Sequence, residues 1–154
     1  MLGIVFVTLA LNLLVVAPPG YESAWLRIPE RHRAVVRSID LWDRGYAQAK
    51  RSTMGIMLPA KVRESMIWHE TYHVVMYADP QLEHDWQATF WPGDKLVGKA
   101  ITPRARQNYR EDFAESAEKL IQNGCLDEPG ERLSRERWLR DRVFRPGELR
   151  ECVA

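Results

Sequence analysis

The sequence predicts an α+β fold that is mostly helical, with a small sheet beside one long helix. Two observations lead to this fold class. Apolar residues recur at intervals of three and four over several stretches that Pro, Gly and Asn interrupt, which is the period of amphipathic helices. A short apolar run, residues 54–58, ends at Pro59 just before the helix of residues 60–77, as expected of a short strand. A chain of 154 residues fits one domain.

The N-terminal residues 1–17 are nearly all apolar, with Thr8 and Asn12 as polar breaks. Such a run predicts a signal peptide or a membrane tether, so the protein is expected to be secreted or anchored outside the cell. The alternative is a buried core strand, in which case the protein would be cytoplasmic. The Pro18-Pro19-Gly20 break then marks the start of a single domain, residues 18–154.

The next segments are expected to alternate between extended and helical structure. Residues 21–27 are interpreted as a short extended piece, and Pro29 as the first turn of a helix. Helical spacing continues to about residue 50, through Val35, Ile39, Trp42, Tyr46 and Ala49. The strand at residues 54–58 has two interpretations. Its free edge pairs with an extended peptide, or it is a buried strand without that role.

The second long helix, residues 60–77, carries the pattern His69-Glu70-Thr71-Tyr72-His73. Two histidines four residues apart lie on one helix face, so both imidazoles can reach one metal ion. Glu70 projects beside the first histidine and can take a proton from a metal-activated water. A single buried histidine is usually a hydrogen-bonded core residue, but this pair with its adjoining glutamate favours a metal site.

The remaining segments are a loop and two helices. Residues 80–106 are expected to form a loop whose aromatic side chains either wall a cleft or pin the loop to the protein body: Trp86, Phe90 and Trp91. Asn108 is a suitable N-cap for a helix over residues 108–122, and Asn123-Gly124 a suitable end. The last helix, residues 131–144, is expected to expose its charges as a solvated face with i, i+4 pairs.

A catalytic zinc normally has three protein ligands, and the chain offers three candidates for the third: Asp79, His84 and Glu111. Asp79 has the spacing of the metzincin ligand, but that pattern needs a glycine where this chain has Met76. His84 has no geometric argument. Glu111 lies on a separate predicted helix, and Glu115 shares its face four residues later.

The segments HETYH and EDFAE together resemble small gluzincin zinc metallopeptidases, similar to the catalytic domain of anthrax lethal factor and minimal zinc peptidases. The resemblance covers roughly residues 53–122. It implies a zincin-like fold with Zn²⁺ as cofactor. It also implies His69, His73 and Glu111 as metal ligands, Glu70 as general base, and Glu115 as a second-shell support.

The relatives often carry a tyrosine about seven residues before the ligand glutamate, where it stabilises the oxyanion. This chain has Arg104 there, so Arg104 and Tyr109 are the candidates for that role. The expected function is zinc-dependent hydrolysis of peptide bonds. The alternatives are a non-catalytic zinc-stabilised protein-interaction domain and a metal-free, membrane-tethered binding module.

Net charge and cysteine content indicate which partners and which cysteine roles to expect. A formal net charge of +1 offers no electrostatic basis for a nucleic-acid partner, so the expected partner is a peptide or protein substrate. The chain has two cysteines, Cys125 and Cys152. They are too few and too far apart for a cysteine metal cluster, and either form one bridge or remain free thiols.

Overall fold

The computed structural model describes residues 15–61, 63–126 and 131–152. The expectation of a signal peptide or membrane tether falls mostly on residues 1–14, which lie outside the described residues. Among the helices that the structure describes, none has the length and apolar character needed to cross a membrane.

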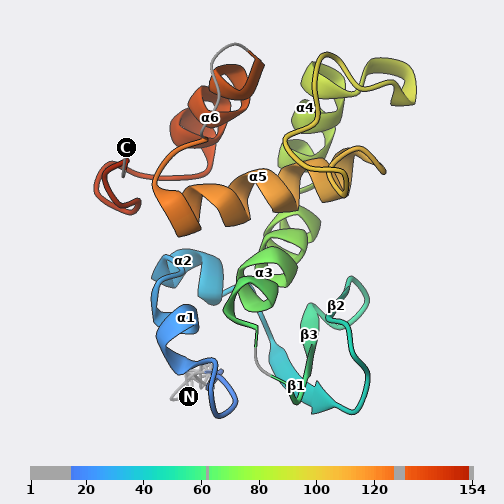
Figure 1. The fold of residues 1–154 in the computed structure, drawn as a ribbon. Coiled ribbons are helices and arrows are strands. Elements are labelled where there is room, and N and C mark those ends of the chain that lie inside the picture. The colour runs from blue at the N-terminus through green and yellow to red at the C-terminus, as the bar shows by residue number, and fades with distance from the viewer. Residues whose placement is uncertain (1–14, 62, 127–130, 153–154) are drawn as a thin grey trace, which may run out of the picture.

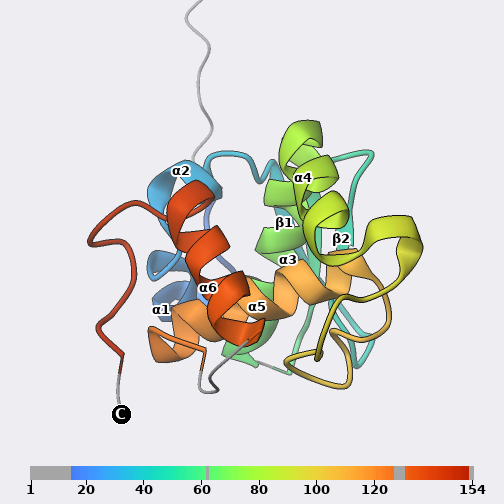
Figure 2. The ribbon, with the colours of Figure 1, turned by 90° about the horizontal axis from the view of Figure 1, so that it is seen from above.

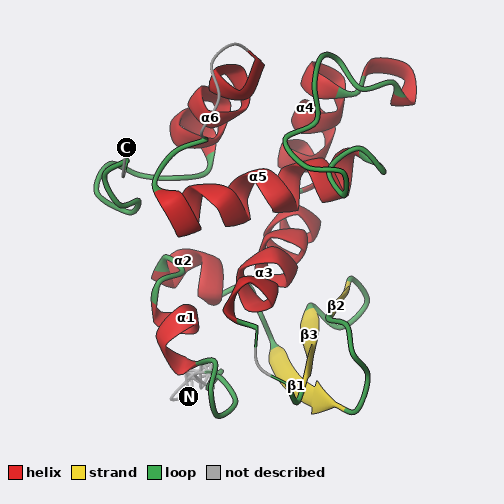
Figure 3. Cartoon of the chain, viewed as in Figure 1, coloured by secondary structure: helices red, strands yellow, loops and turns green. Residues whose placement is uncertain are grey.

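The chain forms an α+β fold in which helices surround a central helix and a small sheet lies to one side (Figures 1 and 3). This confirms the predicted class. The elements are α1 (Glu22–Leu26), α2 (Glu30–Arg33), β1 (Ser38–Trp42), β2 (Gln48–Lys50), β3 (Gly55–Pro59), α3 (Glu64–Ala78), α4 (Pro80–Phe90), the 3-10 turn η1 (Pro92–Asp94), α5 (Tyr109–Asn123) and α6 (Glu131–Arg142).

Helix α3 is the centre of the arrangement, because α1, α2, the sheet, α4 and α5 all contact it. In Figure 1, α5 passes over α3, with α4 and α6 above α5 and with α1, α2 and the sheet below. Figure 2, seen from above, places α4 and α6 toward opposite sides of the molecule. The main core fills the space between these elements, with fully buried side chains that include Ile56, Ile67, Tyr72, Trp86, Phe113, Leu120 and Leu139.

The sheet is mixed, with the order β1-β3-β2. Strand β1 runs parallel to β3 and strand β2 antiparallel to it, so that Ile39 and Ala49 both lie opposite Ile56. The strand predicted at residues 54–58 is confirmed as β3. Its two edges are both paired, so the interpretation that β3 offers a free edge to a peptide is wrong, and the buried-strand interpretation holds.

The helix predicted from Pro29 to about residue 50 is wrong beyond its first turn. Helix α2 ends at Arg33, and the following residues form β1, a loop and β2. Ile39 and Trp42 lie in β1 and Ala49 in β2, and pairing with β3 satisfies the backbone groups of both strands. The extended piece expected at residues 21–27 is also wrong. It is α1, whose Ala24 and Trp25 are buried and whose Ala24 carbonyl accepts a 2.7 Å hydrogen bond from Trp68 Nε1.

The loop predicted for residues 80–106 is wrong in its first half, because Pro80–Phe90 is helix α4. Asp79 caps this helix by accepting hydrogen bonds from the backbone nitrogens of Gln81 and Leu82, and Pro80 occupies a first-turn position where its missing N–H costs nothing. The same Asp-Pro pair therefore ends α3 and begins α4. The aromatic side chains of this segment are buried, which confirms that they pin it to the protein body: Trp86, Phe90 and Trp91.

Helices α5 and α6 agree with the prediction in extent but not entirely in exposure. Gly124 ends α5 with a left-handed φ of 81°, as a C-terminal glycine should. Helix α6 has i, i+4 pairs such as Arg140 with Glu136 at 2.8 Å. Its Arg135, however, is 1% exposed, so the expectation of a fully solvated charged face is wrong there. Cys125 and Cys152 are joined by a disulfide, which ties the C-terminal segment to the end of α5.

Candidate metal centre

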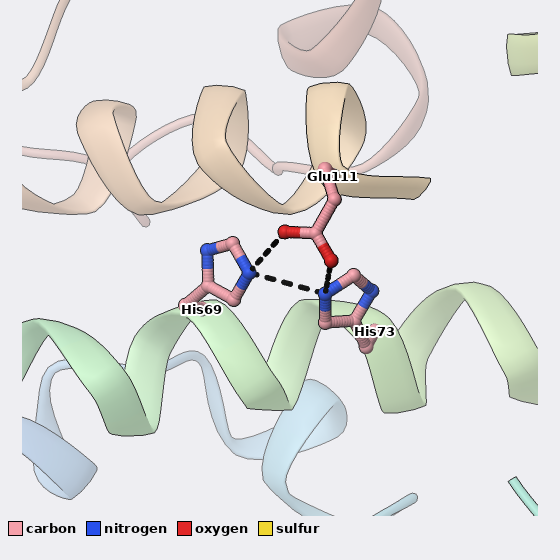
Figure 4. A group of neighbouring side chains, drawn as sticks. All are labelled: His69, His73 and Glu111. Carbon is pink, nitrogen blue, oxygen red and sulfur yellow. Dashed lines mark hydrogen bonds and ion pairs between the residues drawn. The ribbon is translucent and has the colours of Figure 1, made fainter. Parts of the chain in front are cut away.

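His69, His73 and Glu111 come together where α5 passes over α3 (Figure 4). The two histidines project from successive turns of α3, and Glu111 projects toward them from the first turn of α5. The Nε2 atoms of His69 and His73 are 3.1 Å apart. The Glu111 carboxylate lies 3.1 Å from His69 Nε2 and 3.4 Å from His73 Nε2.

These separations suit a single small metal ion. Tetrahedral coordination with bonds of about 2.0–2.1 Å places neighbouring ligand atoms roughly 3.3 Å apart. The three distances of 3.1 to 3.4 Å match that spacing. Both imidazoles direct Nε2 at the same point, and a cation between them satisfies both lone pairs at once. The buried cluster is therefore positioned to bind a metal ion.

Local structure explains why Glu111 reaches the histidines. Asn108 caps α5, since its side-chain oxygen accepts from the backbone nitrogens of Arg110 and Glu111 at 3.0 and 3.1 Å. The neighbouring Asp112 is fully buried and accepts hydrogen bonds from Arg135 Nε at 3.0 Å and from Trp91 Nε1 at 3.0 Å. The Asn108 cap and the hydrogen bonds of Asp112 with Arg135 and Trp91 hold the first turn of α5 in place over α3.

A second group of carboxylates orients His69. Its Nδ1 lies 3.3 Å from Glu115 Oε1 and 3.2 Å from Glu118 Oε2. A proton on Nδ1 is donated to this pair, which leaves the lone pair of Nε2 free for a metal. Glu115 lies where the sequence predicts a support. Glu118 was missed, although its position seven residues after Glu111 places it on the same helix face.

The cluster carries an excess of negative charge. Burial lowers the pKa of His69, but hydrogen bonds with Glu111, Glu115 and Glu118 outweigh it and raise that pKa to about 11. Burial raises the pKa of Glu111, and hydrogen bonds from the two histidines more than reverse this and lower it. Glu70, 3% exposed, adds another carboxyl group nearby. In the metal-free protein a proton on His69 offsets part of this charge, and a divalent cation bound at Nε2 would offset more of it.

Of the two residues predicted to stabilise an oxyanion, the structure brings Arg104 to the cluster and not Tyr109. Arg104 Nε donates a 2.7 Å hydrogen bond to Glu111 Oε2, and Arg104 Nη2 lies 3.9 Å from Glu70 Oε1. The Tyr109 hydroxyl instead donates to Glu83 Oε1 at 2.9 Å. Arg104 therefore brings a guanidinium to this centre.

The two rejected ligand candidates lie elsewhere in the structure. Asp79 caps α4, and the His84 side chain is 74% exposed beside Asp85. Neither belongs to a group of potential metal ligands among the described residues.

A pocket of about 300 Å³ opens beside the cluster. Its wall includes Glu70, His73, Arg104 and Glu111 from the cluster, together with Gln48 and Ala49 of β2 and the preceding Ala47. Its wall also includes Tyr77 and Arg110, which the sequence reasoning missed. Tyr77 follows His73 by one helical turn and its ring stacks on that imidazole, with centroids 6.1 Å apart. The i+4 spacing is the signal that would have found Tyr77.

Comparison with known proteins found no matching family model, no matching curated protein and no matching solved structure. The chemistry of the site therefore carries the functional proposal.

Proposed function

We propose that this protein is a zinc-dependent metallopeptidase of the gluzincin type, with a zincin-like arrangement of its helices and sheet. One observation carries the proposal: α5 delivers Glu111 to the two histidines of the H-E-x-x-H helix, with Glu70 beside them on the wall of a pocket. Two histidines and one glutamate are the protein ligands of one class of catalytic zinc site, with an open position for water or substrate.

Each group at the site has a separate role in the proposed hydrolysis. Zinc bound by His69, His73 and Glu111 would lower the pKa of a water and polarise the scissile carbonyl. The Glu70 carboxylate takes a proton from the attacking water and passes it to the leaving amine. The Arg104 guanidinium, 3.9 Å from Glu70, supplies positive charge for the carbonyl oxygen as it becomes negative.

The pocket favours catalysis over a purely structural metal. Structural zinc sites are closed by four protein ligands, whereas this cluster offers three and borders a pocket of about 300 Å³. Two histidines and a carboxylate also hold iron(II) in some oxygenases. Glu70 supports the hydrolytic assignment, because it is a base that lies next to the ligands without belonging to the triad.

The substrate is proposed to be a peptide or protein segment. The sheet order leaves β2 at an edge, and Gln48 and Ala49 of this strand line the pocket. An extended peptide can pair with such an edge through backbone hydrogen bonds. The disulfide supports action outside the cytoplasm, since such bonds persist mainly in oxidising compartments.

Zinc content and cleavage test the proposal together. We expect elemental analysis to find about one zinc per wild-type chain, and much less in Glu111→Ala, because three ligands become two. Glu70→Gln should keep its zinc and lose cleavage of a random peptide mixture read by mass spectrometry. Glu64→Gln is the control, since it removes a carboxylate from the exposed start of α3. Cleavage that survives in Glu70→Gln, or wild-type protein without zinc, would contradict the proposal.

A further inference from the structure

Arg110 lies in the same pocket as the candidate metal centre, and nothing in the proposed chemistry uses it. It directly precedes Glu111 on α5 and lines the pocket wall with Tyr77 and Asn108. Its Nε and Nη2 atoms both lie 2.8 Å from Glu83 Oε1. The Arg110 side chain is 40% exposed and that of Glu83 only 10%. The buried Glu83 carboxylate thus holds the guanidinium of Arg110 at its Nε and Nη2 atoms, and part of the guanidinium stays open to the pocket.

The charges around Arg110 do not balance. Glu83 also accepts a hydrogen bond from Arg51 Nη2 at 3.0 Å, so two guanidiniums share one carboxylate. In the described part of the chain, no other acidic group lies within ion-pair distance of Arg51 or Arg110. One positive charge is left over, and the N-terminus of α5 adds a partial positive charge at the same place.

Arg104, the other arginine of the pocket, already pairs with the carboxylates of the metal centre. It lies 2.7 Å from Glu111, 3.9 Å from Glu70 and 4.0 Å from Glu115. A substrate carboxylate beside Arg104 would meet repulsion from those three carboxylates, whereas the developing oxyanion would be stabilised by the metal ion as well. The net positive charge near Arg110 makes its part of the pocket wall the favourable place for a substrate carboxylate.

We infer that Arg110 binds a carboxylate of the substrate whose scissile bond lies at the metal centre. This inference rests on the proposed function and deepens it. The planar guanidinium fork matches the planar carboxylate, and Glu83 has already restricted its rotation. Because the pocket measures about 300 Å³, the carboxylate belongs to a residue near the scissile bond, as a free C-terminus or as an Asp or Glu side chain.

Hydroxamate probes test this binding without requiring catalysis. A hydroxamate group chelates zinc, and a series of linear probes of increasing length can carry a carboxylate or a carboxamide at the far end. For zinc-loaded wild-type protein, isothermal titration calorimetry should show the acid binding about 10-fold to 100-fold more tightly than the amide at the best length. Arg110→Gln should abolish that difference, while its amide still donates a hydrogen bond to Glu83.

Arg106→Gln is the matched control, because it removes a guanidinium from the exposed segment before α5, outside the pocket. It should keep the full preference for the acid. Thermal unfolding checks that each variant is folded, and Arg110→Lys provides a second variant that retains the charge without the fork. We expect Arg110→Lys to retain only part of the preference. A preference that is unchanged in Arg110→Gln, or absent from the wild type at every probe length, would overturn the inference.

Peptide cleavage distinguishes the sources of the carboxylate and tests the carboxylate site separately from the peptidase activity. Paired peptides that end in a free acid or an amide test the C-terminus, and pairs with Glu or Gln test a side chain. Arg110-dependent probe binding without cleavage of any peptide would reject the peptidase and leave the carboxylate site standing. Cleavage with equal efficiency for acid and amide peptides, in the wild type and in Arg110→Gln, would reject the carboxylate site alone.

Discussion

The paired carboxylates behind His69 lead to a specific prediction about metal affinity. Glu115 and Glu118 approach the same nitrogen, Nδ1, at 3.3 and 3.2 Å. One N–H can form a single well-aligned hydrogen bond, so each carboxylate can replace the other when one is lost. We therefore expect Glu115→Gln and Glu118→Gln to be mild individually and severe in combination.

The magnitude follows from the role of such groups in other metal sites. Loss of the group that orients a metal-bound histidine weakens metal affinity by about 10-fold to 100-fold, or roughly 1.4 to 2.8 kcal/mol. The double variant should show a loss in this range, because both acceptors of the Nδ1 proton lose their charge. Each single variant should weaken zinc binding by less than about 10-fold. The double-mutant cycle should then give a coupling energy on the order of 1 kcal/mol.

The assay is competition for zinc against a chromophoric chelator of known affinity, at neutral pH. Glu64→Gln controls for the loss of one negative charge on the protein surface. Single variants that each produce the full loss would refute the shared hydrogen bond. A double variant with the affinity of the wild type would show that neither carboxylate orients His69 for a metal.

Two predictions concern stability. Asp112→Asn leaves the guanidinium of Arg135 buried without its counter-charge and should lower the free energy of unfolding by about 3–5 kcal/mol. The double variant Asp112→Asn/Arg135→Met should lose less of the free energy of unfolding than Asp112→Asn. A double variant that urea denaturation finds less stable than the single variant would contradict this. Burial, the largest influence, lowers the pKa of His32 to about 4. The unfolded chain, with an ordinary histidine pKa of about 6.5, therefore binds more protons than the folded protein between these values. Stability should fall as pH drops through this window, by up to about 3 kcal/mol for this group. Urea denaturation at several pH values should show that the free energy of unfolding falls less with pH in His32→Gln than in the wild type. An equal dependence on pH in both proteins would show that His32 does not cause the fall.

Features that depend on neighbours in the chain were accessible from the sequence. The i, i+4 spacing of the histidines requires only one helix, and the helix itself follows from periodicity. The cap at Asn108 and the stop at Gly124 are also local, because each satisfies backbone groups of its own helix end. The strand at residues 54–58 was identified from a short apolar run that ends at a proline.

Other features involve partners that are distant in sequence. The five apolar residues from Val35 to Ala49 have helical spacing, yet pairing with β3 places three of them, Ile39, Trp42 and Ala49, in strands. Arg135 carries a charge that any sequence pattern assigns to the surface, yet Asp112 on another helix allows it to be buried. The charge balance around Arg110 likewise depends on α4 and on the segment after β2.

The sequence by itself determined that two histidines and a glutamate lie on adjacent turns of one helix, and it offered Glu111 as one of three candidates to join them. Only the tertiary structure decided that Glu111 lies within 3.4 Å of both imidazoles, that Glu118 joins Glu115 behind His69, and that Arg104 rather than Tyr109 faces the cluster. The physical reason is that a helix dictates the relative positions of its own side chains, whereas the packing of α5 over α3 depends on the burial of surfaces from the whole chain.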